Sequence, residues 1–199
     1  MLEKPADTKY PLQDLLKRRW SPRAFSDRAI DPAKLGSLLE AARWAASSRN
    51  EQPWRFIVLE RASGEPFERL VACLVDGNIP WAKRAPVLIL VCARIGFEKD
   101  NSPNAHAYYD CGQAAANLTT QALALDLWVH QMAGFSPEKA RVAFSIPVEF
   151  DPVAVLSVGY FGDPATLPEN RRAAETAPRT RKPLSEIAFG AEWNKGLSL

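Results

Sequence analysis

The feature that most constrains the fold of this chain is the apolar run from Pro86 to Ala93, PVLILVCA. A continuous apolar run of this length, rich in β-branched residues, is typical of a central strand buried in a sheet. Three further segments are predicted to be strands, at residues 54–59, 127–132 and 152–161. Because the strands alternate with helical segments, the chain is predicted to be α+β or α/β, with helices covering a small sheet.

Five segments are predicted to be helical, at residues 11–19, 31–46, 67–74, 105–125 and 136–144. Two of them begin at recognisable caps, Asp31–Pro32 and Ser136–Pro137. The long Ala-rich segment is apolar nearly all round, which implies burial on most sides. About the last forty residues lack strong periodicity and are either disordered or fixed across another surface. Their apolar residues favour the second alternative: Leu184, Ile187, Phe189 and Trp193.

Length and composition narrow the class of protein. The 199 residues suffice for one core, and no repeat or linker divides them, so residues 1–199 are predicted to form a single domain. A net charge of +2 is too small to favour a nucleic acid or a membrane surface as partner. The three cysteines lie far apart, so we expect buried thiols and no metal site. We also expect a cytoplasmic protein, because no signal peptide or membrane span is recognisable.

The first candidate site is the segment RWSPRAF, which starts at Arg19. If this segment is extended, Arg19, Ser21 and Arg23 project to the same side. Two guanidinium groups that flank a hydroxyl suit a phosphate monoester, because arginine binds phosphate through paired hydrogen bonds. The alternative is a solvated basic helix end.

Two further segments carry polar side chains that suit a ligand. The loop SSRNEQ at residues 47–52 contains Asn50 and Gln52, whose amides match the mixed donor and acceptor edge of a pyrimidine-like ring. Composition alone favours a helix C-cap and turn there. Near the C-terminus, Arg179 and Arg181 alternate in a basic segment that alone would usually be a solvated tail. The chain has neither GxGxxG nor a P-loop, so a dinucleotide would have to dock without a dedicated glycine-rich loop.

Several single residues admit two interpretations. His130, in an apolar strand, is predicted to be a satisfied core residue rather than a catalytic one. Tyr108, Tyr109 and Trp81 are likewise predicted to be core residues rather than pocket residues. Asp110, inside an apolar helix, is either a buried, hydrogen-bonded carboxylate or an exposed one on a narrow polar face.

Taken together, these segments resemble the FMN-dependent nitroreductase family along nearly the whole chain. The string Ser-Ser-x-Asn-x-Gln-Pro-Trp is the most specific match, and Ala46 departs from the proline that usually precedes it. The other matches follow in the family's order: Arg19 to Phe25, Ala85–Pro86, the Ala-rich helix, Gly134–Phe135, the strand ending at Tyr160 and Arg181 to Leu184.

The resemblance implies an α+β, nitroreductase-like fold with a small mixed or antiparallel central sheet flanked by helices. It also implies an intertwined homodimer with an extended C-terminal segment and FMN at the subunit interface. Arg19, Ser21 and Arg23 would hold the phosphate and ribityl chain, with backbone contacts from Trp20. The other implied contacts are Arg179 and Arg181 at the phosphate, Ser47, Ser48 and Asn50 from the partner at the ring, and a backbone N–H of the turn Ala133–Gly134 near flavin N5.

The implied activity is that of an oxidoreductase. Hydride would pass from NADH or NADPH through flavin N5 to small acceptors such as nitroaromatics or quinones, in a ping-pong cycle. No side chain would act as a catalytic residue, because the cofactor carries the chemistry. The alternatives are a same-fold oxidoreductase acting on an enone, an aldehyde or a halogenated aromatic, and a non-catalytic protein that binds or stores flavin.

Overall fold

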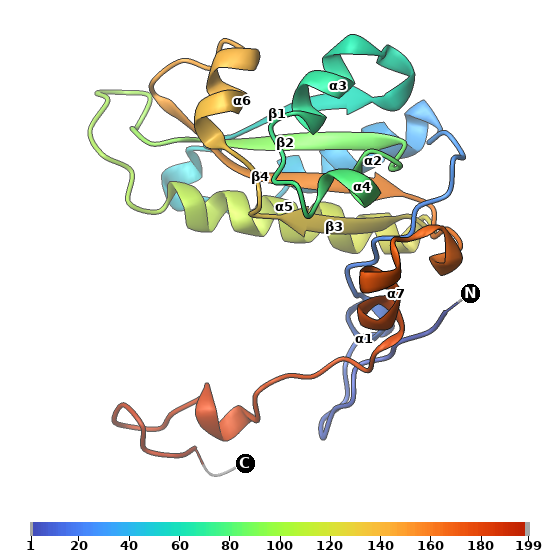
Figure 1. The fold of residues 1–199 in the computed structure, drawn as a ribbon. Coiled ribbons are helices and arrows are strands. Elements are labelled where there is room, and N and C mark those ends of the chain that lie inside the picture. The colour runs from blue at the N-terminus through green and yellow to red at the C-terminus, as the bar shows by residue number, and fades with distance from the viewer. Residues whose placement is uncertain (1, 198–199) are drawn as a thin grey trace.

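The computed structural model describes residues 2–197 and contains a four-stranded sheet with helices on both faces (Figure 1). The strand order is β1 (Trp54–Glu60), β2 (Val87–Arg94), β4 (Phe150–Gly159) and β3 (Trp128–Met132). Every neighbouring pair is antiparallel. The structure thus confirms the predicted α+β class and the four predicted strands.

The strand β2 is central, as its apolar run predicts, and all of its residues except Arg94 are buried. Its alternate side chains enter two cores, one on each face of the sheet. Leu88, Leu90 and Cys92 belong to the first core, and Val87, Ile89 and Val91 belong to the second. The strand therefore needs a cover on both faces, and this requirement explains why it contains almost no polar residue.

Helices α2 (Pro32–Arg43) and α5 (Ala107–Ala124) cover one face of the sheet. The other face is covered by α3 (Glu65–Val71), α4 (Ile79–Ala82) and α6 (Pro137–Ala143) (Figure 1). Both predicted caps form: the Asp31 carboxylate accepts from the Ala33 N–H at 2.7 Å, and Ser136 Oγ accepts from the Lys139 N–H at 3.1 Å. Short 3₁₀ turns lie at Ser48–Asn50, Arg61–Ser63, Pro164–Thr166 and Leu184–Glu186.

The N-terminal segment and the chain around α7 (Glu169–Thr176) lie beside one another at one end of the sheet, whereas the chain after α7 extends away from them (Figure 1). Here the structure adds a helix that the sequence did not predict, α7, next to the predicted short helix α1 (Asp14–Arg18). Only Glu175 of α7 is buried, so the helix has no apolar stripe by which to recognise it. Beyond α7 the chain runs away from the sheet with Leu184, Ile187 and Trp193 exposed. That this tail is fixed across another surface stays a prediction.

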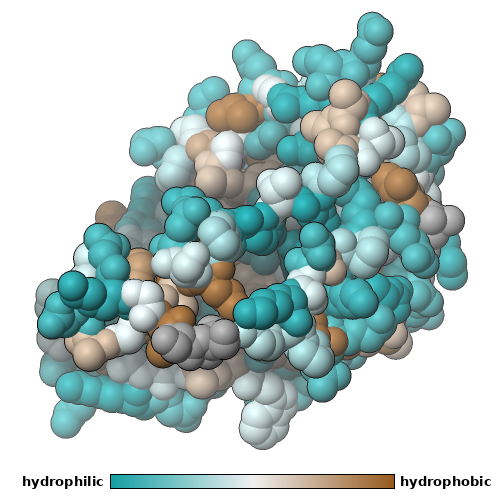
Figure 2. All heavy atoms as spheres, turned by 90° about the horizontal axis from the view of Figure 1, so that it is seen from below, coloured by the Kyte–Doolittle hydropathy of each residue, from teal (hydrophilic) through white to brown (hydrophobic). Residues whose placement is uncertain are grey.

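All three cysteines are buried and unpaired, as predicted. In the part of the chain that the structure describes, none of the helices combines the length and the apolarity needed to cross a membrane. Seen from below, most of the surface is hydrophilic and hydrophobic residues are scattered over it (Figure 2). Single exposed apolar residues are normal on folded proteins and define no site by themselves.

Candidate functional site

The segment that begins at Arg19 is extended and lies against the end of β4. Phe25 forms a bridge with Phe161, and the Gly162 N–H donates to the Ala24 carbonyl at 2.9 Å. Gly162 is required for this approach, because a Cβ there would lie 2.7 Å from the Ser26 nitrogen and closer still to the Phe25 backbone. The segment is therefore fixed beside the end of β4 by an isolated bridge.

The predicted alternation of this segment is confirmed. Trp20, Pro22 and Ala24 are buried, whereas Arg19, Ser21 and Arg23 are half-buried. Trp20 fixes the inner side, since its ring meets the rings of Trp128 and Phe161 edge-on, each with centroids 5.6 Å away. The outer side therefore carries two guanidinium groups and a hydroxyl. Arg19 donates to Ser21 Oγ at 3.3 Å.

The C-terminal segment brings further cations to the same place. Arg179 donates through Nη1 to the carbonyls of Lys4 and Lys17, at 2.7 and 3.0 Å, and so ties both ends of the chain together. Burial lowers the pKa of Arg179, and the charges of Arg19 and Arg181 lower it further. The structure thus brings Arg19, Arg179 and Arg181 within electrostatic reach of each other, although they are widely separated in sequence.

The cations at this position are poorly neutralised. Burial lowers the pKa of Arg19, and the charge of Arg181 adds to that effect. Among residues 2–197, no carboxylate lies within 4.0 Å of Arg19, Arg179 or Arg181. Like charges that are held together without a counterion repel one another, and a bound anion would relieve that repulsion. The donor set fits a phosphate group.

Arg23 connects the cations to the sheet. Its guanidinium carbon lies 5.8 Å from the ring centroid of buried Trp81, and Trp81 packs on His130 with centroids 4.5 Å apart. His130 Nδ1 lies 2.9 Å from the Pro22 carbonyl, which accepts its proton. Burial, followed by the charge of Arg23, lowers the pKa of His130 to about 4. These contacts describe a neutral, hydrogen-bonded histidine, in line with the predicted core role.

The turn Ala133–Gly134 follows β3 and is held by the segment before α4. The Gly134 carbonyl accepts from Asn78 Nδ2 at 3.0 Å and from the Val75 N–H at 3.1 Å. A Cβ on Gly134 would lie 2.7 Å from Asn78 Nδ2, so a side chain at this position would displace Asn78. The neighbouring Gly77 carbonyl accepts from Arg171 at 3.1 Å. Residues 75–81 therefore contact the turn on one side and the arginines Arg171 and Arg23 on the other.

The loop with Ser47, Ser48 and Asn50 is fixed by a buried carboxylate. Asp110 is 2% exposed and accepts from the Ser48 N–H at 3.0 Å. Of its two interpretations, the buried, hydrogen-bonded carboxylate is therefore the correct one. Asn50 has a φ of 57° and its neighbour Arg49 a φ of 55°, both left-handed. Such backbone is uncommon outside glycine and is kept only where the surroundings enforce it.

Within one chain, this loop and the cations are not brought together. Asp110, which holds the loop, lies in the first turn of α5. Trp128 packs on Trp20 of the segment from Arg19 to Phe25, called the cation segment below, and Trp128 follows the other end of that helix. The 18 residues of α5 span about 27 Å. The two groups of predicted site residues therefore lie at opposite ends of α5.

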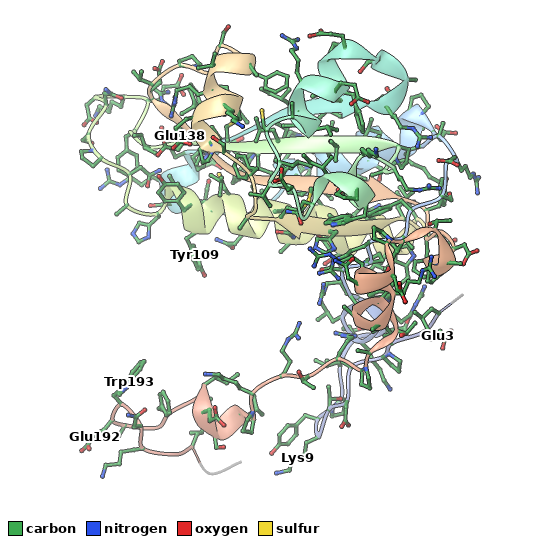
Figure 3. The ribbon with its side chains drawn as sticks, in the orientation of Figure 1. Glu3, Lys9, Tyr109, Glu138, Glu192 and Trp193 are labelled. Atoms are coloured by element: carbon green, nitrogen blue, oxygen red, sulfur yellow. The ribbon has the colours of Figure 1, made fainter. Side chains whose placement is uncertain are left out.

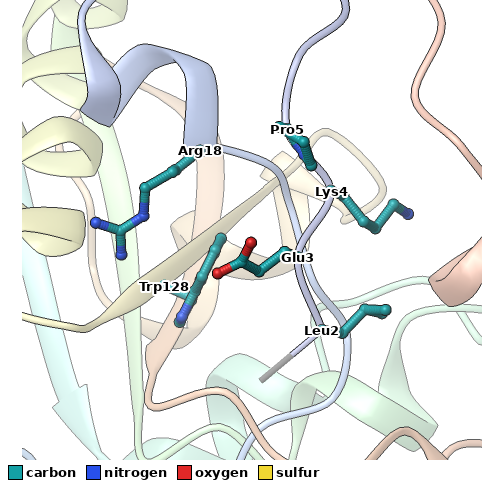
Figure 4. Close-up of a pocket in the computed structure, with 6 residues that line it drawn as sticks. All are labelled: Leu2, Glu3, Lys4, Pro5, Arg18 and Trp128. Atoms are coloured by element: carbon teal, nitrogen blue, oxygen red, sulfur yellow. The ribbon is translucent and has the colours of Figure 1, made fainter.

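The pocket beside the cations is small. Its volume is about 80 Å³, and the N-terminal segment closes it over Trp128 (Figure 4). Sites that enclose small organic ligands usually have several hundred Å³. This pocket is therefore too small for a nucleotide. It is lined by Leu2, Glu3, Lys4, Pro5, Arg18 and Trp128.

Two expectations need correction. Tyr108 and Tyr109 are not core residues, since 51% and 70% of them are exposed, and Tyr109 projects away from the sheet (Figure 3). They lie in the first turn of α5, where the buried positions are Ala107, Asp110 and Cys111 instead. Trp81, in contrast, is 1% exposed and is a core residue as predicted.

Sequence reasoning missed two residues at the cation segment, Lys4 and Glu175. Glu175 is completely buried and accepts from the backbone N–H groups of Arg23 and Ala24. Lys4 donates to the Glu175 carbonyl at 2.8 Å. Neither residue belongs to a motif, and contacts across more than 150 positions leave no signal in a single sequence.

Comparison with known proteins gives one consistent result. The profile of the nitroreductase family matches residues 16–160. A protein of Mycolicibacterium smegmatis, described as an uncharacterized 15.4 kDa protein in the ask 5' region, is 38% identical over 72% of this chain and 99% of its own length. A putative NADH dehydrogenase/NAD(P)H nitroreductase of Methanothermobacter thermautotrophicus is 31% identical over 82% of this chain and 83% of its own.

Solved structures agree with that match. A structure described as an oxidoreductase containing FMN superposes with a TM-score of 0.89 at 33% identity, covering 95% of this chain and 96% of that one. A nitroreductase family protein from Clostridium difficile 630 superposes with a TM-score of 0.69 at 28% identity, covering 89% and 96% of the two chains. The similarity to the first of these structures therefore extends over nearly the whole chain.

Proposed function

Because the chain belongs to the nitroreductase family, we propose that it is a flavin-dependent oxidoreductase that binds FMN without a covalent bond. The observation that carries this proposal is the gathering of Arg19, Arg179 and Arg181 next to Ser21 and Arg23, with little neutralisation from the protein. The similar FMN-containing oxidoreductase supports the choice of cofactor.

Each residue has a role in this proposal. Arg19, Arg23 and Arg181 neutralise the phosphate, Ser21 donates to it, and Trp20 contributes backbone contacts. Arg179 mainly orients the C-terminal segment, because its Nη1 is already bonded to two carbonyls. Preorganised charge of this kind binds an anion without further rearrangement.

Bound FMN would supply hydride transfer from NADH or NADPH to a small acceptor such as a nitroaromatic or a quinone. We assign the Gly134 N–H as the donor that faces the ring edge, where it would stabilise negative charge. The bonds from Asn78 and Val75 to the Gly134 carbonyl hold the turn rigidly for this task. Because the chain has no dinucleotide motif, the donor and the acceptor would use the same face of the bound flavin in turn, which is a ping-pong order.

A second copy of the chain would complete the site. Ser47, Ser48 and Asn50 of one chain lie at the end of α5 opposite the cations, so we propose that they reach the flavin of the partner in a homodimer. The exposed C-terminal tail would then pack on that partner, giving the intertwined arrangement. In this proposal residues 1–199 act as one FMN-binding domain.

A visible absorption spectrum tests the proposal. The purified protein should be yellow with bound FMN, should bleach on anaerobic addition of NADH or NADPH, and should regain colour with a nitroaromatic or a quinone. A protein that only stores flavin would bind FMN without rapid bleaching. An oxidoreductase with another substrate would bleach but regain colour only with an enone, an aldehyde or a halogenated aromatic. Colourless protein that ignores added FMN would contradict the proposal.

A further inference from the structure

Glu175 is the least exposed charged side chain of the cation region. It lies on α7 and is 0% exposed, whereas the cations around it are half-buried or exposed. A buried carboxylate is costly unless hydrogen bonds or charges compensate it. Its presence amid a predicted anion site therefore needs an explanation, since a negative charge there opposes the binding of a phosphate.

The contacts of Glu175 point to the backbone rather than to a cation. Oε1 accepts from the N–H of Arg23 at 2.8 Å and from the N–H of Ala24 at 3.0 Å. Among the residues that the structure describes, none is hydrogen-bonded to Oε2, and the Arg23 guanidinium lies 4.0 Å from it. One carboxylate oxygen thus holds two consecutive amides of the cation segment.

We propose that Glu175 is a positioning residue of the site: its carboxylate fixes the backbone at Arg23 and Ala24, so that Arg19, Ser21 and Arg23 all face the phosphate of FMN. This inference rests on the proposed function. The Ala24 carbonyl accepts from the Gly162 N–H, so both polar backbone groups of Ala24 are bonded only while Glu175 is in place.

The backbone carbonyl of Glu175 makes a second contact, which joins the C-terminal segment to the N-terminal segment. Arg179 and Arg181 follow Glu175 by four and six residues. Lys4 donates to the backbone carbonyl of Glu175 and Arg179 donates to the Lys4 carbonyl, so bonds to backbone carbonyls link α7, the N-terminal segment and the second group of cations. The carboxylate of Glu175 therefore positions the cation segment near the N-terminus, and its backbone carbonyl helps to hold the C-terminal cations.

Glu175 affects phosphate binding in two opposite ways: its negative charge opposes the phosphate, whereas its hydrogen bonds position the cations. Substitutions separate these two effects. Glu175→Gln removes the charge but keeps an oxygen for both amides. Glu175→Met keeps the approximate shape but removes both oxygens. If positioning dominates, Glu175→Gln should bind FMN as tightly as the unchanged protein or more tightly. Glu175→Met should bind FMN at least about tenfold more weakly, because two charge-assisted bonds are lost.

The experiment measures the affinities of the full-length, flavin-free protein for FMN and for riboflavin, which lacks the phosphate. The expected result is that Glu175→Met loses the preference for FMN while its riboflavin affinity stays the same. Glu169→Ala, at an exposed glutamate of the same helix, is the matched control and should change neither affinity. Hydrogen exchange of the Arg23 and Ala24 amides should speed up in Glu175→Met and stay slow in Glu175→Gln.

Three results would overturn the inference: an unchanged FMN preference in Glu175→Met, an equal loss of both affinities, or a loss of FMN preference in Glu175→Gln. If Glu175→Met does not fold, the FMN preference of Glu175→Gln alone tests the inference: its loss overturns the positioning role. Failure of the proposed function looks different, since the unchanged protein would then bind neither flavin, and the inference would fall with it.

Discussion

Arg19 and Arg179 are held by different partners, and that difference determines what each can give to a ligand. Arg19 donates to the hydroxyl of Ser21, a neutral group, and keeps its charge available. Arg179 donates to two backbone carbonyls of the N-terminal region and so also holds the C-terminal segment against that region. At the scale of single residues, the site therefore contains cations for binding and a cation for assembly, although the sequence alone does not distinguish them.

Substitution of the binding cations should weaken FMN binding. Arg19→Ala and Arg181→Ala are each expected to cost about 1.5–3 kcal/mol, the usual contribution of a charge-assisted hydrogen bond. Titration of the flavin-free protein with FMN, followed by flavin fluorescence, measures the loss. Arg18→Ala is the control, because Arg18 is paired with Asp14 at 3.3 Å and lies next to Arg19. Unchanged affinity in both test variants would remove these residues from the phosphate site.

His130 should make the stability of the protein depend on pH. Its pKa of about 4 lies below the ordinary value of 6.5, so the unfolded chain binds the proton first as the pH falls. The stability that comes from neutral His130 is complete above pH 6.5 and is lost between pH 6.5 and about 4. The shift corresponds to about 3 kcal/mol.

Chemical denaturation between pH 4 and 7 checks this expectation. His130→Gln should flatten the curve in that range, because glutamine does not titrate and can still donate to the Pro22 carbonyl. His106→Gln, at the exposed second histidine, should leave the curve as it is. Parallel curves for the unchanged protein and His130→Gln would argue against a neutral His130 with a lowered pKa.

At the scale of elements, the site depends on how the segment after α1 attaches to β4. The attachment uses few bonds, because the Phe25–Phe161 bridge consists of two: the Ser26 N–H donates to the Tyr160 carbonyl and the Gly162 N–H to the Ala24 carbonyl. Because the backbones approach so closely at Gly162, the attachment tolerates no side chain there.

Two glycine substitutions should have opposite effects. Gly162→Ala should destabilise the protein by about 1–3 kcal/mol, because the new methyl group overpacks the Phe25 backbone. Gly36→Ala should stabilise it by about 0.5–1 kcal/mol, because Gly36 is exposed on α2 and an added Cβ would meet no described atom within 4 Å outside its own stretch of helix. Thermal unfolding measures both changes. Equal melting temperatures for the two variants would contradict the close approach seen at Gly162.

At the scale of the whole molecule, the separation of the two groups of site residues is decisive. The loop held by Asp110 and the cation segment beside Trp128 lie at opposite ends of α5. If both groups bind the same flavin, two chains must contribute to each site, and this requirement can be tested by mixing variants.

Mixed dimers of Arg19→Ala and Asn50→Ala should regain activity. Arg19→Ala is defective in holding the phosphate and Asn50→Ala in flavin reactivity, but a mixed dimer contains one site with neither change. Random assembly of equal amounts should restore about a quarter of all sites. Co-refolding the two variants and measuring NADPH oxidation with a nitroaromatic checks this outcome. Activity no higher than the average of the two separate variants would mean that each site belongs to a single chain.

The sequence determined the features that depend on neighbours along the chain. The alternation of Arg19, Ser21 and Arg23 followed from the geometry of extended backbone, and the cap at Asp31 followed from the hydrogen-bonding needs of a helix start. The burial of β2 followed from its apolar run. Each of these features is decided within a few residues, so one sequence suffices to predict it.

Only the tertiary structure decided which distant residues meet. Glu175 reaches the amides of Arg23 and Ala24, and Arg179 reaches Lys4, across more than 150 positions. These contacts depend on how α7 packs against the termini, and α7 has no apolar stripe that would predict its packing. The placement of Asn50 away from the cations likewise depends on the direction and length of α5 in the assembled fold. Local physics sets the elements, whereas packing of the complete chain sets the distances between them.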